Sequence, residues 1–69
     1  MSNNIASERV RAGLSREQLA KEFGVGPTSV MRWENGTSVP TTATVVKLAD
    51  RFGCSIDYLL ALTDERLRR

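Results

Sequence analysis

Two glycines and a proline limit what residues 14–36, LSREQLAKEFGVGPTSVMRWENG, can form. Gly24 follows the last apolar residue of a helical pattern, and a helix end favours a residue that tolerates positive φ. Gly26 then loosens the chain. Pro27 suits the first turn of a following helix, because its missing N–H leaves no hydrogen bond unmade there. The stretch therefore predicts two short helices joined by a tight turn.

The first of these helices is expected to run from about Arg16 to Phe23. Ser15 can cap it, and Gln18 stands three residues later, which completes a capping-box pattern. On two helices that cross at a wide angle, the apolar and small residues of both would form one inward-facing set. Ala20 matters because a larger side chain at this position would push the two helices apart. The set is Leu19, Ala20, Phe23, Val25, Val30 and Trp33.

This stretch resembles the helix-turn-helix of the Cro and lambda-repressor-like (XRE-type) family of bacterial and phage DNA-binding proteins. The small, glycine and apolar positions of the family's pattern fall on Ala20, Gly24, Val30 and Trp33. The ending WENG at 33–36 and the run CSIDYLL at 54–60 are also similar to the family. The resemblance covers about residues 5–62. It implies an all-α, five-helix lambda-repressor-like domain over residues 1–62, with the helix-turn-helix as helices two and three, and a short charged tail over 63–69.

The remaining helices are predicted from helical spacing. The first should span residues 2 to about 12, capped by Ser2 or Asn3, and it is expected to be the weakest element because Glu8 stands where the family commonly has leucine. Thr41 or Thr42 should cap a helix that runs to Phe52, and Ser55 should cap a last one. In the first helix, Ile5, Arg9 and Ala12 fall on one face. The apolar stripe of the next is Val45, Val46, Leu48, Ala49 and Phe52, and the residues of the last that are expected to face the core are Ile56, Leu59, Leu60 and Leu62.

Composition excludes several classes of function. The chain has 69 residues, one cysteine and no histidine, so it can form one small domain but neither an internal disulfide nor a four-ligand zinc site. Cys54 is interpreted as a buried packing residue. No apolar run approaches the length of a membrane span, and a cytoplasmic location is expected. We expect no metal, no cofactor and no membrane partner, and the chain lacks the residue sets of an enzyme site.

The outward face of the third helix is the candidate DNA reader. Because Val30 and Trp33 fix its inward face, Thr28, Met31, Arg32 and Asn35 point most nearly outward. Helical spacing alone fits a solvated surface equally well, and the resemblance favours DNA reading. The expected base-reading residues are Pro27, Thr28, Met31 and Arg32. The expected phosphate contacts, from small polar groups, free amides and a helix N-terminus, are Ser15, Arg16, Ser29, Asn35, Gly36, Thr37 and Ser38.

Arg9 has two interpretations. It can be a solvated surface arginine, or it can pair with Glu34, as the family's matching arginine and glutamate do. Such a pair would be a structural device that ties the first helix to the end of the third.

The implied function is a sequence-specific transcriptional regulator that binds double-stranded DNA. A repressor is expected, acting as a homodimer on a pseudo-palindromic operator, with Tyr58 and Leu62 as candidates for the dimer surface. A restriction-system controller is possible within the same class. The alternative is an antitoxin-type interaction module that binds a toxin partner and regulates its own operon.

Overall fold

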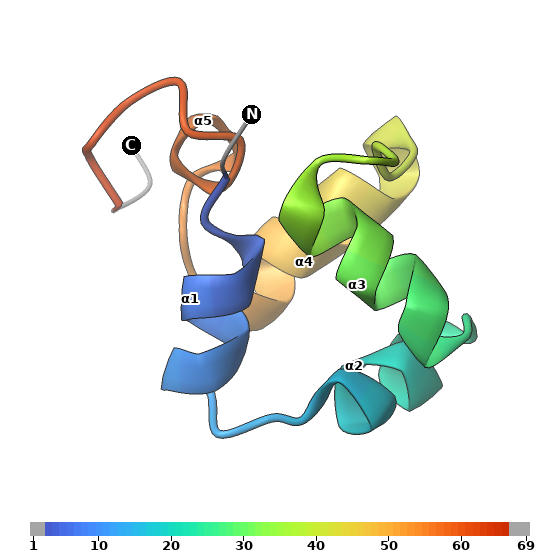
Figure 1. Cartoon of the computed structure of the whole chain (residues 1–69). Coiled ribbons are helices and arrows are strands. Elements are labelled where there is room, and N and C mark those ends of the chain that lie inside the picture. The colour runs from blue at the N-terminus through green and yellow to red at the C-terminus, as the bar shows by residue number, and fades with distance from the viewer. Residues whose placement is uncertain (1–2, 67–69) are drawn as a thin grey trace.

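The computed structural model describes residues 3–66, and this part of the chain is all-helical, as predicted. Figure 1 shows the helices in chain order. They are α1 (Ile5–Arg11), α2 (Arg16–Phe23), α3 (Pro27–Asn35), α4 (Thr42–Phe52) and α5 (Ile56–Leu59). α2 and α3 are the two helices of the predicted helix-turn-helix.

The corner between α2 and α3 forms through the residues that predicted it. The Ser15 hydroxyl accepts the backbone N–H of Gln18 at 3.0 Å, and the Gln18 side chain accepts the backbone N–H of Ser15 at 2.7 Å. At the other end Gly24 lies in the left-handed region with φ 67°, and the N–H of Val25 bonds back to the Ala20 carbonyl. Pro27 then opens α3 without a lost hydrogen bond.

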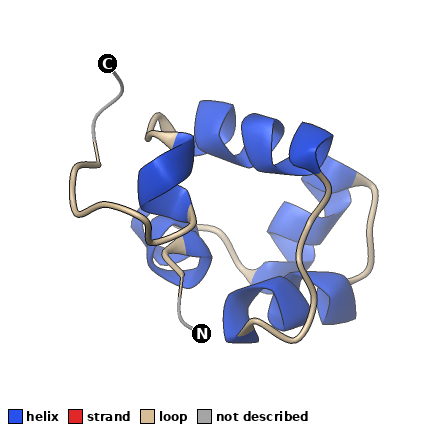
Figure 2. Ribbon diagram, turned by 90° about the horizontal axis from the view of Figure 1, so that it is seen from above, coloured by secondary structure: helices blue, strands red, loops and turns tan. Residues whose placement is uncertain are grey.

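One apolar core joins all five helices within the described residues. From α3 it takes Val30 and Trp33, and from α2 it takes Leu19 and Ala20, which is 1% exposed and lets the two helices approach closely. Viewed from above, the helices enclose this shared core (Figure 2). Its other members are Ile5, Val45, Leu48, Ala49, Phe52, Cys54 and Leu59.

The N-terminal helix begins later than predicted. α1 starts at Ile5 with Asn4 as its N-cap residue, and not Ser2 or Asn3; Ser2 lies outside the described residues. The Asn3 side chain still bonds this start, because its oxygen accepts the Ile5 backbone N–H at 3.0 Å, while the amide nitrogens of both asparagines bind other helices. Asn3 donates to the Trp33 carbonyl at 2.8 Å, and Asn4 donates to the Tyr58 carbonyl at 2.6 Å. The chain therefore reaches α3 and α5 before it enters α1.

Three of the expected core residues are exposed. Val46 and Ile56 are each 40% exposed and Leu62 is 68% exposed. Val46 lies about 100° around α4 from the buried Val45, and Leu62 follows Ala61, whose positive φ of 63° redirects the chain after α5. Ala12 is exposed because α1 has already ended at Arg11.

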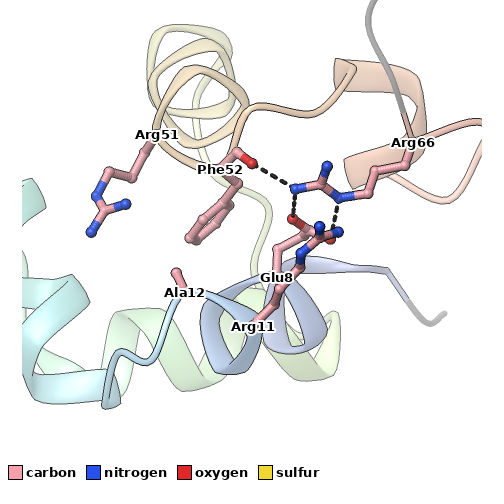
Figure 3. Close-up of a pocket in the computed structure, with 6 residues that line it drawn as sticks. All are labelled: Glu8, Arg11, Ala12, Arg51, Phe52 and Arg66. Carbon is pink, nitrogen blue, oxygen red and sulfur yellow. Dashed lines mark hydrogen bonds and ion pairs between the residues drawn. The ribbon is translucent and has the colours of Figure 1, made fainter.

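Glu8 is the buried charged residue of α1, and the C-terminal segment (residues 63–66) supplies its partner. Glu8 is 3% exposed. The Arg66 guanidinium donates to both Glu8 carboxylate oxygens, at 3.0 and 2.8 Å, and to the Phe52 carbonyl at 2.7 Å (Figure 3). The hydrogen bonds to Glu8 raise the pKa of the Arg66 guanidinium, which is charged at any pH near neutrality.

The backbone of the C-terminal segment is bound as well. The Ser55 N–H donates to the Arg66 carbonyl at 2.8 Å, and the Ser55 hydroxyl donates to the Glu65 carbonyl at 3.1 Å. Residues 63–66 of the expected charged tail are not helical and are bonded to Ser55 at the start of α5, and residues 67–69 lie outside the described part. Arg66 thus pairs with the residue, Glu8, that stands where the resemblance would put a leucine.

We predict that Arg66→Ala lowers the melting temperature clearly more than Arg51→Ala. Arg51 makes a comparable bidentate pair with Glu22, but both of those side chains are about 40% exposed, so no buried charge is left behind when the pair is lost. Adding Glu8→Leu to Arg66→Ala should recover most of the loss, because the buried carboxylate is then gone. Circular dichroism melts of the four proteins measure this. Equal melting temperatures for the two arginine variants would contradict a stabilising role of the Arg66 pair.

Candidate nucleic-acid interface

The outward face of α3 is exposed and polar, while its inward face is fixed. Val30 and Trp33 are 0% and 7% exposed, so the helix cannot rotate without opening the core. On the opposite side Thr28 and Arg32 are exposed, and Met31 is 40% exposed. Within the described residues no hydrogen bond or ion pair engages the Arg32 guanidinium. Its five N–H groups are therefore available to a ligand.

The other residues expected on this face occupy its two ends. Pro27 is exposed at the first position of α3, and Ser29 is half-buried in the same turn. Asn35 is exposed at the last position. No acidic residue lies in the first turn of α3, so the positive end of the helix dipole is not neutralised there.

The loop after α3 differs from the prediction in its backbone. The expected free amides are already bonded within the described chain: Gly36 N–H to the Trp33 carbonyl at 3.3 Å, Thr37 N–H to the Asn35 side-chain oxygen at 2.9 Å, and Ser38 N–H to the Arg32 carbonyl at 3.2 Å. This loop is a closed C-terminal cap of α3, with Gly36 at φ 78°. The groups left for a phosphate are the Thr37 and Ser38 hydroxyls and the Asn35 amide nitrogen.

The N-terminus of α2 lies beside the last turn of α3. The Arg16 Nε donates to one oxygen of the Glu34 carboxylate at 3.0 Å. The Arg9 Nε donates to the other oxygen at 2.6 Å. Arg9 and Glu34 thus form the pair that the resemblance implies, and Arg16 joins it from a third helix.

Arg9 and Arg16 differ in how far their side chains are buried, and this indicates different roles. The Glu34 and Arg9 side chains are 5% and 13% exposed, and Arg9 also donates to the Leu14 carbonyl at 2.8 Å. Arg16 is 49% exposed. Arg9 is therefore a structural partner, while Arg16 faces solvent at the start of α2. Sequence reasoning missed the Arg16 contact because its partner lies 18 positions away, outside any helical spacing.

A metal-binding cluster and a candidate membrane span are both absent from the described residues 3–66. No cluster of histidine, cysteine, aspartate and glutamate side chains there could hold a metal ion. Cys54 is fully buried. None of the helices in this part of the chain is long and apolar enough to span a bilayer.

A fixed, exposed, polar helix held by a glycine corner against a capped helix defines a helix-turn-helix DNA-binding domain. The sequence matches the helix-turn-helix family over residues 5–59, so the chain belongs to this family. Residues 5–59 include α1 to α5.

Three relatives illustrate the family. The chain is 34% identical over 67 residues to the cryptic phage CTXphi transcriptional repressor RstR of Vibrio cholerae serotype O1, covering 94% of this chain and 60% of that protein. A second Vibrio cholerae RstR is 35% identical over 71 residues, covering 97% and 64%. An uncharacterized HTH-type transcriptional regulator of Archaeoglobus fulgidus is 31% identical over 67 residues, covering 97% and 96%. The chain thus spans under two thirds of the length of the two phage repressors. No solved structure matches it.

We predict that Arg9 and Glu34 are strongly coupled in stability. Because both side chains are largely buried, removal of one partner leaves the other without compensation, and the coupling should exceed the roughly 0.2–1 kcal/mol of an exposed pair. A double-mutant cycle with Arg9→Ala and Glu34→Ala in urea unfolding measures the coupling. The same cycle on Arg51 and Glu22 is the exposed control and should give a smaller value. Zero coupling between Arg9 and Glu34 would show that the pair does not hold α1 to α3.

Proposed function

We propose that this chain is a sequence-specific transcriptional regulator that represses by occupying an operator, as a homodimer on a pseudo-palindromic site. The observation that carries the proposal is the exposed outward face of α3. Its one guanidinium, on Arg32, has no partner in the described residues, and the opposite side of the helix is packed into the core. A helix so presented fits the major groove of DNA, where each base pair displays a distinct pattern of donors and acceptors.

The chemistry of each side chain assigns its role in the groove. Arg32 donates two N–H groups to O6 and N7 of a guanine. Thr28 bonds a base edge or places its methyl against a thymine methyl, and Met31 supplies a further apolar contact. Pro27, at the tip of the helix, contacts the neighbouring base pair by shape, because it has no backbone donor.

Contacts to phosphates position the helix along the groove without reading sequence. One set lies at the start of α2, and the other follows α3, where the hydroxyls and not the amides are available. Ser29 adds a contact from the first turn of α3, where helix N–H groups favour an anion. The proposed phosphate-contacting residues are Ser15, Arg16, Ser29, Asn35, Gly36, Thr37 and Ser38, with Gly36 allowing close approach by its lack of a side chain.

The exposed apolar residues after and on α5 support a dimer. Ile56 and Leu62 are 40% and 68% exposed, and Tyr58 lies half-buried between them in the chain. The backbone of the domain extends 30 Å along its longest axis, which is comparable with the spacing of about 34 Å between successive major-groove faces of one duplex. A dimer that joins two copies through this surface is therefore of the size of two adjacent half-sites.

Repression is favoured over the antitoxin-type alternative by the relatives. The two Vibrio cholerae proteins are transcriptional repressors, and the Archaeoglobus fulgidus protein is an HTH-type transcriptional regulator. A toxin partner has no comparable support from these relatives.

We predict that Arg32→Ala and Arg16→Ala weaken DNA binding in different ways. Arg32→Ala should cost about 1–3 kcal/mol on the duplex that the protein prefers and much less on a scrambled duplex, because it removes a base contact. Arg16→Ala should weaken both duplexes alike and lower the salt slope by about one unit, because it removes a phosphate contact. Fluorescence anisotropy over several salt concentrations measures both. Equal losses on the two duplexes for Arg32→Ala would contradict base reading by this residue.

A further inference from the structure

We propose that Glu34 is a positioning residue for DNA binding: its buried carboxylate orients Arg16 so that the two Nη groups of that guanidinium clamp one phosphate of the DNA backbone. This inference rests on the proposed function, and it adds a role for an acidic residue that itself touches no DNA.

The geometry of the Arg16 bond leaves the phosphate-binding edge free. Of the three Arg16 guanidinium nitrogens, only Nε donates to Glu34, at 3.0 Å. No described interaction engages the two Nη atoms. In a planar guanidinium the edge formed by the two Nη groups is separate from Nε, and it matches two phosphate oxygens. The side chain is 49% exposed, so this edge is open to solvent.

Glu34 can orient Arg16 because it is itself fixed. Its second oxygen accepts from the Arg9 Nε at 2.6 Å, and Arg9 is held in turn by the Leu14 carbonyl. The Glu34 side chain is 5% exposed. Arg16 is thus held before DNA arrives, which reduces the rotamer entropy that an arginine loses on binding a phosphate.

The proposal predicts the sign of the change in DNA affinity when the Glu34 charge is removed. A carboxylate near DNA repels phosphate, so removal of the Glu34 charge alone should strengthen binding. If Glu34 positions Arg16, its neutralisation should weaken binding instead. In Glu34→Gln, the single amide oxygen is expected to keep the hydrogen bond from the more buried Arg9. The amide NH₂ then faces the Arg16 Nε–H, and because both groups are donors they cannot bond, so Arg16 is released.

The first test compares Arg16→Lys with Arg16→Ala on the preferred duplex. A lysine keeps the charge but cannot bind Glu34 and two phosphate oxygens in one plane. Arg16→Ala should lower affinity by about ten-fold or more, as for loss of a charged hydrogen bond, and Arg16→Lys should lose most of that factor. Wild-type affinity for Arg16→Lys would overturn the proposal, because charge alone would then suffice. Residue 16 is exposed, so both variants are expected to fold.

The second test measures Glu34→Gln in the wild-type and Arg16→Ala backgrounds, below the melting temperature of every variant. Glu34→Gln should weaken binding in the wild-type background and should leave it unchanged or strengthen it when Arg16 is absent. The same change in affinity in both backgrounds would overturn the positioning role, since Glu34 would then act only through charge or through Arg9. A chain that binds no duplex at all would instead refute the proposed function, so the two failures are distinguishable.

Discussion

The structure depends on the close packing of α2 against α3. Ala20 is small enough to let the helices meet, Gly24 turns the chain in the left-handed region, and Val30 and Trp33 fill the space between them. Since the inward side of α3 is determined by this contact, its outward side is determined too. The direction of the candidate reading face is therefore a consequence of core packing alone.

Two buried carboxylates, Glu34 and Glu8, then hold other parts of the chain together through ion pairs. Glu34 joins α3 to Arg9 of α1 and to Arg16 of α2 with one carboxylate. Glu8 joins α1 to Arg66 in the C-terminal segment, which is also bonded to Phe52 of α4. In a chain with so small a core, buried charges that are fully hydrogen-bonded add specificity to the arrangement of helices, although each would be destabilising without its partner.

The helix-turn-helix could be predicted from sequence because its signals are local. The Ser15–Gln18 capping box, Gly24 and Pro27 each act within a few residues, and the structure contains all of them. The Arg66 bond to Glu8 and the Arg16 bond to Glu34 were not predicted, since 58 and 18 positions separate the partners and no local pattern links them. The Arg9–Glu34 pair, 25 positions apart, was predicted only because the family resemblance implied it. The closed loop after α3 was also missed, because side chains such as Asn35 can bond either a neighbouring amide or a ligand. Val46 and Ile56 were expected to face the core and are exposed, because a single apolar residue on a surface helix need not be buried.

Selection of bound duplexes from a random pool tests the central claim most directly, which is that the exposed α3 face reads DNA sequence in two copies. The account predicts enrichment of one motif made of two inverted half-sites, with centres about ten base pairs apart and a guanine in each half that depends on Arg32. Enrichment of no motif, with binding equal across the pool, would contradict it.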